Sequence, residues 1–198
     1  MPEQQRVGEQ RPGGRAARVR TAVLDATSAV LDERGYERLT VEEIATRAGV
    51  HKTTVYRRWP TKALLVEDAA LAHAERNIPI PDTGTLLGDL QALGRAVVAT
   101  IGAEVGARRS RSIVAAAAAS SDVAASLNAF WDERLSLTRP IVERAIARGE
   151  IPPSTDPNLI VEALVGPLWM RLLLTGEPIN SKIADHLATL VATGAGRQ

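Results

Sequence analysis

The sequence contains no cysteine and only three histidines in 198 residues. Without cysteine, the chain can form neither a disulfide framework nor a zinc site built on thiolates. The histidines, His51, His73 and His186, are isolated and show none of the spacings that metal ligands share. We therefore expect no metal site, and no motif indicates a cofactor.

Three further signals are missing. No nucleophile motif and no pair of titratable residues suggests a catalytic cleft, which argues against an enzyme. The first residues are polar and rich in Pro and Gly, without the apolar segment of a signal peptide, so a cytoplasmic protein is expected. Residues 157–175 have the length of a membrane span. Glu162, Arg171 and the Gly166-Pro167 pair interrupt this stretch, and we do not expect it to cross a membrane.

The charges are unevenly divided along the chain. Residues 1–62 hold twelve Lys or Arg against eight Asp or Glu, a net charge of +4. Residues 63–198 hold twelve against fifteen, a net charge of −3. A basic N-terminal third joined to an acidic remainder is typical of a DNA-facing module followed by a second domain.

Residues 40–62, TVEEIATRAGVHKTTVYRRWPTK, predict two short helices joined by a tight turn. Thr40 and Glu43 have the spacing of a capping box, and Gly49 suits the left-handed conformation that ends a helix. A second short helix follows and stops at Pro60. Two helices joined in this way form a helix-turn-helix. The alternative, an ordinary helical hairpin, does not require Lys, Thr, Tyr and two Arg on one exposed side.

The exposed side of the second helix carries the residue types that read duplex DNA. Arg57 is the first candidate for a base contact, because Arg binds guanine bidentately. Thr53 and Thr54 can touch base edges or a thymine methyl group, while Tyr56 and the helix N-terminus at Thr40 suit phosphates. The expected DNA-binding residues are Thr40, Lys52, Thr53, Thr54, Tyr56, Arg57, Arg58 and Lys62.

The stretch GVHKTTVYRRWPTKALL, residues 49–65, resembles the recognition-helix region of the tetracycline-repressor (TetR) family of bacterial regulators. The resemblance is strong over about residues 18–71 and weaker towards the C-terminus. It departs at Arg58, where many members carry an aromatic residue, and at Pro60, where many carry a polar or basic one. In the family the lysine that matches Lys62 contacts a phosphate. A cation in the first turn opposes the helix dipole, which also suggests an anionic partner.

Apolar periodicity predicts helices along most of the remaining chain. A basic turn is expected at residues 106–112, GARRSRS, and Pro140 is expected to kink a long helix. With the two motif helices, we expect an all-α fold of about nine helices. The other predicted helices span residues 16–34, 61–77, 85–105, 113–120, 121–148, 157–175 and 180–192.

This pattern divides the chain into three parts. Residues 1–15 are poor in apolar side chains and are expected to form a disordered arm. The arginines of this arm either add phosphate or minor-groove contacts, as homeodomain arms do, or belong to a solvated tail. Residues 16–62 form the three-helix DNA-binding domain, and residues 63–198 form a helical domain for ligand binding and dimerisation.

The C-terminal helices predict a dimer and a ligand pocket. Residues 157–175 are apolar on nearly every side, so this helix needs cover on two sides. With residues 180–192 it predicts a homodimer through a four-helix bundle, which is also how the family dimerises. The resemblance further implies an unidentified small-molecule effector. The candidate pocket residues are His73, Trp131, Arg134, Trp169 and Met170, and for each of them plain core packing is the alternative.

Together, these patterns predict a homodimeric transcriptional regulator, and a repressor in particular. Each subunit would place the second motif helix in the major groove of double-stranded DNA, with half-sites about one helical turn (~34 Å) apart on a near-palindromic operator. The alternative is an architectural DNA-binding protein that prefers no operator and responds to no effector.

Overall fold

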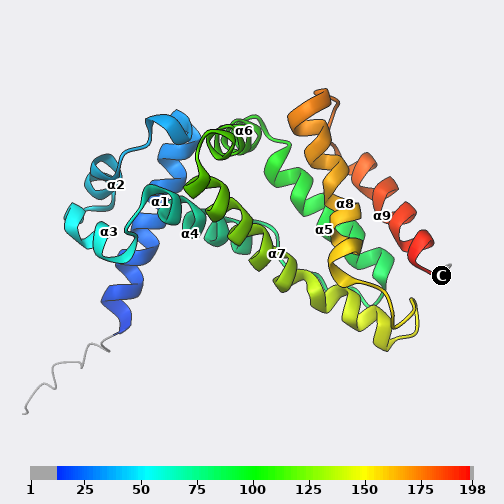
Figure 1. Ribbon diagram of the computed structural model, residues 1–198. Helices are drawn as coiled ribbons and strands as arrows, with labels where there is room; N and C mark the ends of the chain where they lie inside the picture. Colours follow the sequence, from blue (N-terminus) through cyan, green and yellow to red (C-terminus); the bar gives the residue numbers. More distant parts are fainter. Residues whose placement is uncertain (1–12, 197–198) are drawn as a thin grey trace, which may run out of the picture.

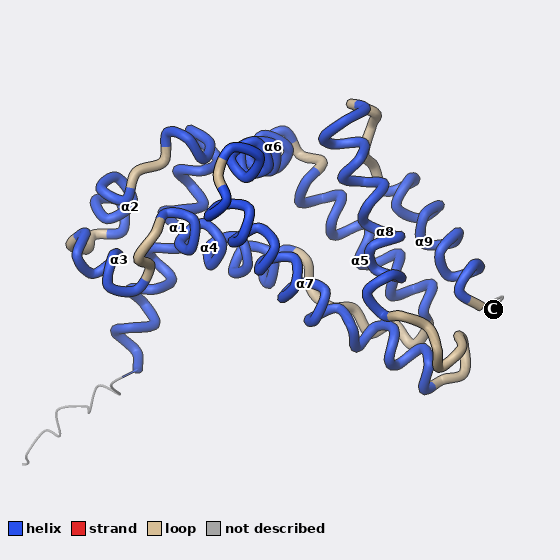
Figure 2. Tube along the Cα trace, viewed as in Figure 1, coloured by secondary structure: helices blue, strands red, loops and turns tan. Residues whose placement is uncertain are grey.

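The computed structural model describes residues 13–196, and every regular element in that range is helical (Figures 1 and 2). This confirms the all-α fold with about nine helices. The first twelve residues, which make up most of the proposed arm, lie outside the described range. The elements are α1 (Gly13–Arg38), α2 (Val41–Ala48), α3 (Lys52–Arg58), α4 (Lys62–Asn77), α5 (Leu86–Ile101), α6 (Glu104–Ala119), α7 (Ser121–Ala147), α8 (Pro157–Met170), the π-helix η1 (Arg171–Thr175) and α9 (Ser181–Ala195).

Helices α1 to α4 gather at one end of the molecule around a shared core (Figure 1). Val23 and Val30 of α1, Ile44 of α2 and Val55 of α3 are all fully buried in it. The same core includes Val123 of α7, with side chains of α6 beside it. The predicted DNA-binding domain, residues 16–62, is therefore closed by helices from the far part of the sequence.

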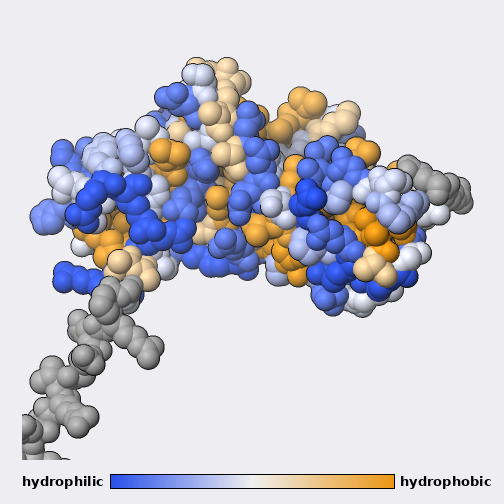
Figure 3. Space-filling model, turned by 60° about the horizontal axis from the view of Figure 1, so that its bottom comes forward, coloured by the Kyte–Doolittle hydropathy of each residue, from blue (hydrophilic) through white to orange (hydrophobic). Residues whose placement is uncertain are grey.

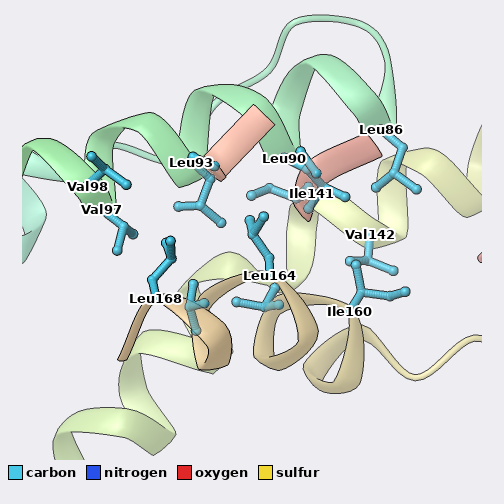
Figure 4. Close-up of a cluster of buried hydrophobic side chains, with 14 of the residues drawn as sticks. Leu86, Leu90, Leu93, Val97, Val98, Ile141, Val142, Ile160, Leu164 and Leu168 are labelled. Carbon is cyan, nitrogen blue, oxygen red and sulfur yellow. The ribbon is translucent and has the colours of Figure 1, made fainter. Parts of the chain in front are cut away.

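A second core lies between α5, α7, α8 and α9. In Figure 4, Leu90 and Leu93 of α5 point towards Leu164 of α8, and Ile141 of α7 closes the group. These four side chains are at most 2% exposed. At about 25 cal/mol per Å² of buried apolar surface, such a cluster is the main source of stability in this half of the chain.

Several element boundaries differ from the predictions. Residues 106–112, expected as a basic turn, lie inside α6, and α5 ends at Ile101. Gly35, expected as the end of the first helix, marks a kink within α1, with φ 73° and ψ 176°. The stretch 157–175 changes from α-helix to π-helix at Arg171. The last helix ends at Ala195 instead of at about residue 192.

The helix formed by α8 and η1 leaves much of its apolar surface uncovered. By length and composition alone, Pro157–Thr175 is able to cross a membrane, and 28% of it is buried in the fold. Helices α5 and α6 pass the same test only when they are taken together across an 84° bend. We use the name "apolar stripe" for Leu159, Met170 and Leu174 of this segment together with Leu190 of α9, whose side chains are 61%, 56%, 80% and 69% exposed.

Candidate nucleic-acid interface and interior cavity

Capping interactions define both ends of α2. The Thr40 hydroxyl accepts a hydrogen bond from the Glu43 N–H (3.3 Å), and Gly49 adopts the left-handed conformation (φ 67°, ψ 34°). Both caps confirm the sequence prediction. The Glu43 carboxylate does not complete the capping box. Instead it pairs with Arg34 (3.0 Å) and Arg47 (2.7 Å), which ties α2 to the end of α1.

Helix α3 has one buried side and one exposed side. Val55 is fully buried and Trp59, which follows the helix, is 5% exposed. Lys52, Thr53, Tyr56, Arg57 and Arg58 are exposed, and Thr54 is half-buried. Within the described residues, the Arg57 guanidinium forms no ion pair or hydrogen bond with protein. The predicted DNA-binding face therefore presents its cations outwards.

Asp68 of α4 fixes the end of α3. One carboxylate oxygen accepts a hydrogen bond from the Trp59 indole (2.9 Å), and the other pairs with Arg20 of α1. The Arg58 guanidinium lies 5.4 Å from the centre of the Trp59 ring. This junction is not predictable from the sequence, because residues 20, 59 and 68 come together only when α1, α3 and α4 pack.

Lys62, for which a phosphate contact is predicted, binds backbone carbonyl groups within the fold. Its ammonium group donates to the carbonyl oxygens of Tyr36 (3.0 Å), Leu39 (3.3 Å) and Glu37 (3.5 Å), and it lies 4.3 Å from the centre of the Tyr36 ring. These contacts use all three N–H groups of the lysine. Burial lowers the pKa of Lys62. The lysine therefore caps carbonyl groups at the end of α1. Within the fold, these carbonyl dipoles are the negative partners of its ammonium group.

An interior cavity of about 440 Å³ lies between α4, α5, α6, α7 and α8. Four of the five predicted pocket residues line it: His73, Trp131, Arg134 and Trp169. Met170 does not line the cavity, and its side chain is 56% exposed. Because each residue of an α-helix is rotated by about 100° from the previous one, Met170 faces outwards where Trp169 faces inwards.

The cavity wall is joined to the DNA-binding module through Arg109 of α6. Its guanidinium donates to His73 Nε2 and to Asp32 Oδ1 of α1, each at 2.8 Å. Because arginine has no acceptor, His73 must accept through Nε2 and is therefore neutral. Burial, followed by the nearby Arg109, lowers the pKa of His73. Sequence reasoning missed Arg109 because its segment was expected to be a surface turn.

Three more charged side chains line the cavity: Arg134, Glu67 and Glu162. Arg134 is 7% exposed and donates one hydrogen bond, from Nη2 to the Ile78 carbonyl (3.2 Å). Burial lowers the pKa of its guanidinium. Glu67 has one carboxylate oxygen, Oε2, that is buried without a hydrogen-bond partner among the described residues. No group of three side chains in the described range has the arrangement of a metal site.

The surface reflects this division of roles. Figure 3 shows mostly hydrophilic atoms over the end of the molecule that carries α2 and α3, with larger hydrophobic areas over the half that carries α5, α8 and α9. The two halves of the molecule thus differ in the polarity of the surface that they expose to solvent.

Comparison with known families identifies both halves of the chain. The family model described as "Bacterial regulatory proteins, tetR family" matches residues 23–69. The model described as "Tetracyclin repressor-like, C-terminal domain" matches residues 80–191.

Individual proteins resemble the chain over almost its whole length. The transcriptional regulator AqdR of Rhodococcus erythropolis is 34% identical over 93% of this chain and 89% of its own. The DNA-binding transcriptional repressor TetR of Mycobacteroides abscessus is 30% identical over 88% of this chain and 94% of its own. The crystal structure of the TetR family transcription regulator SCO0332 superposes with a TM-score of 0.79 at 32% identity, covering 89% of this chain and 97% of that one.

Proposed function

The chain belongs to the tetR family of bacterial DNA-binding transcriptional regulators, and we propose that it is a homodimeric repressor whose operator affinity changes when a small molecule fills the cavity. The observation that carries the proposal is the two-sided structure of α3. Its inner side is held in the core by Val55, and Asp68 holds the following Trp59. Its outer side presents Arg57 without a protein partner among the described residues. A rigid helix with free donors on one side is suited to major-groove binding.

The roles of the exposed residues follow from their chemistry. Arg57 is proposed to bind a guanine, and Thr53 and Thr54 to contact neighbouring base edges. Tyr56 and the N-terminus of α2 at Thr40 are proposed to hold phosphates, because helix N-termini bind anions. Lys52 and Arg58 add positive charge at the two ends of α3. Because its ammonium is occupied, Lys62 is proposed to support this surface from behind.

The apolar stripe supports the homodimer. Four large apolar side chains exposed by more than half on helices that contact one another form the kind of apolar patch that monomeric proteins rarely expose. They lie on α8, η1 and α9, at the end of the molecule away from α3 (Figure 1). Two copies that cover each other's stripe would form a four-helix bundle and leave both α3 helices free. A near-palindromic operator with half-sites about 34 Å apart fits such a dimer.

Helix α6 provides the proposed connection between the cavity and the DNA. Arg109 joins the cavity wall to Asp32, and Arg108 donates to the backbone carbonyl of the same residue (2.7 Å). On its other side, Arg111 donates to the Leu172 carbonyl of η1 (3.0 Å). An effector changes operator affinity only if it binds one arrangement of these helices more tightly than the other. A regulator of this kind acts where the DNA is, in the cytoplasm.

The proposal is tested by footprinting the purified protein on the DNA upstream of its own gene and of adjacent genes. We expect protection of a near-palindromic site. Arg57→Ala should reduce the preference for that site over unrelated DNA by roughly ten-fold or more, because a bidentate base contact contributes about 1–3 kcal/mol. Arg76→Ala, a change on the exposed surface of α4, serves as the control and should retain the preference.

Two results would contradict the proposal. Binding that is equally strong on every sequence would identify an architectural DNA-binding protein. An unchanged preference in Arg57→Ala would show that this arginine does not read a base. The same experiment with residues 1–12 deleted tests the proposed contribution of the arm, since an unchanged affinity at fixed salt would show that those residues make no DNA contact.

A further inference from the structure

The chemistry of the cavity indicates what kind of molecule fills it. We propose that the effector is an amphipathic organic anion whose acidic group binds Arg134 while its apolar body lies along the aromatic wall. This inference rests on the proposed function only in treating the cavity as an effector site. It adds the charge of the ligand, its orientation and the residue that selects it.

The argument starts from the hydrogen-bonding state of Arg134. Its side chain is 93% buried on α7, because only 7% of its surface is exposed. A guanidinium has five N–H donors, and the Ile78 carbonyl takes one of them. Among the described residues, no carboxylate forms an ion pair with it. The Glu75 carboxylate favours the charged state of Arg134 from a distance but forms no ion pair with it. A buried cation that no carboxylate pairs with directly is costly, so a pocket that contains one favours an anionic ligand.

The second arginine of the cavity wall provides an internal comparison. Arg109 also lines the cavity, but it is neutralised by Asp32 and hydrogen-bonded to His73. The fold therefore pairs Arg109 directly with a carboxylate, whereas Glu75, the carboxylate that acts on Arg134, forms no ion pair with it. This difference singles out Arg134 as the anion-binding group.

The rest of the cavity indicates the body and the orientation of the ligand. Phe130, Trp131 and Trp169 meet edge to face, with ring centres 5.3 Å apart in each neighbouring pair, and they suit rings or chains. Glu67 lies about three helical turns before Ile78, the residue that follows α4, which is roughly 16 Å along the axis at about 1.5 Å per residue. An acidic group would be repelled at Glu67 and at Glu162, which also lines the cavity, and attracted at Arg134. A hydrogen-bond donor on the far end of the ligand would satisfy the unpaired oxygen of Glu67.

The alternative is a structural role in which Arg134 only caps the Ile78 carbonyl at the end of α4. The two readings differ in their dependence on ligand charge. We suggest titration calorimetry of the full-length protein at neutral pH with three probes of matched shape, para-octylbenzoate, para-octylbenzyl alcohol and para-octylbenzylamine. We expect the benzoate to bind roughly ten-fold or more tightly than the alcohol, because a hydrogen bond to a charged group gains that much, and the amine to bind most weakly.

Variants assign the preference to the residue. Arg134→Met should bind the benzoate and the alcohol equally, whereas Arg139→Met, a change on the exposed side of the same helix, should keep the wild-type order. If Arg134→Met does not fold, Arg134→Lys keeps the positive charge and should keep the order. A wild-type protein that prefers the alcohol or the amine, or an Arg134→Met that keeps the preference for the benzoate, overturns the proposal.

Operator binding measured with the same probes separates this inference from the proposed function. If the benzoate binds through Arg134 but leaves operator affinity unchanged, the ligand class stands and the effector response is wrong. If the alcohol or the amine changes operator affinity while the benzoate does not bind, the regulator stands and the ligand class is wrong.

Discussion

At the scale of single residues, Asp68 positions the end of α3, the proposed DNA-binding helix. Its carboxylate holds the Trp59 indole and the Arg20 guanidinium, so it joins α1, α3 and α4 at one point. Removing it leaves two donors without their acceptor. The penalty for such unsatisfied groups is about 1–3 kcal/mol each when they are buried.

We therefore expect Asp68→Ala to lower the free energy of unfolding by about 1–3 kcal/mol and to weaken binding to all DNA sequences alike. Urea denaturation and DNA titration measure the two effects. Asp25→Ala is a matched control, because Asp25 also joins α1 to α4, through Arg76 at 2.7 Å, but on the exposed surface. Exposed pairs contribute about 0–1 kcal/mol. Equal losses in the two variants would contradict a special role for Asp68.

His73 makes stability depend on pH. In the folded chain its pKa lies below the ordinary value of 6.5, because of burial, Arg109 and Arg76, with Asp32 acting in the opposite direction. Between the folded pKa and 6.5, the unfolded chain binds a proton that the folded chain does not. The free energy of unfolding that depends on neutral His73 is therefore fully present above pH 6.5, and it decreases as the pH falls towards the folded pKa.

The test compares thermal unfolding of the wild type and His73→Gln across this pH range. The glutamine keeps an acceptor for the Arg109 N–H but does not titrate. We expect the melting temperature of the wild type to fall more steeply on acidification than that of His73→Gln. Parallel curves would show that His73 contributes nothing to the acid sensitivity.

Not every residue-scale role was accessible from the sequence. The caps Thr40 and Gly49 were predictable because their contacts lie within a few residues along the chain. The phosphate contact of Lys62 stays a prediction, and its carbonyl partners at residues 36–39 were not predictable because the packing of α1 against α4 brings them to it. The placement of Met170 in the pocket was wrong because apolar character on every side does not indicate which side faces inwards.

At the scale of elements, α6 departs most from the sequence prediction. The segment GARRSRS, residues 106–112, suggested a turn because it begins with a glycine and is polar. In the structure this glycine, Gly106, is buried inside the helix where α5 and α6 meet. Four polar side chains in this segment of α6 bond to other helices: Arg108, Arg109, Arg111 and Ser112. Because they replace apolar side chains, hydrophobic periodicity is absent there. The helix is held by arginines bonded to α1 and η1, which no local pattern reveals.

Gly106 offers a direct test of this close packing. A Cβ atom at this position would overlap the carbonyl oxygen of Thr100, so Gly106→Ala forces α5 and α6 apart. We expect the free energy of unfolding to fall by about 1–3 kcal/mol. Gly14→Ala, where nothing lies within 4 Å, should leave stability unchanged or slightly higher. An unaffected Gly106→Ala in urea denaturation would mean that the α5–α6 junction has room that the structure does not show.

At the scale of the whole molecule, the arrangement places the proposed DNA-binding face and the apolar stripe at opposite ends (Figure 1). The all-α class and the helix-turn-helix followed from patterns repeated over many residues. The cavity did not, because it forms between side chains of five helices and a pattern along one helix cannot show a space between several. The predicted domain boundary near residue 63 stays a prediction, since the N-terminal core also includes side chains of α6 and α7.

The assembly prediction concerns two leucines of the apolar stripe. Leu174→Glu combined with Leu190→Glu should convert the proposed dimer to monomers in sedimentation experiments, because each copy loses about 1.5–3 kcal/mol of burial per leucine. Leu87→Glu, at a leucine 38% exposed on α5, is the control and should leave the dimer intact. A wild type that sediments as a monomer, or that floats with lipid vesicles, would instead favour a membrane-bound role for the stripe.

The three tryptophans of the chain divide between its two working regions. Trp59 lies behind the DNA-binding face, while Trp131 and Trp169 meet at the cavity wall. Replacing residues 131 and 169 with phenylalanine leaves a single fluorophore next to α3, and replacing residue 59 leaves a pair that senses only the cavity. The protein thus contains separate fluorescent reporters for the α3 region and for the cavity. Emission from Trp59 in the variant that keeps only this tryptophan, recorded while a ligand is added, would show whether binding in the cavity changes the surroundings of α3 without any attached dye.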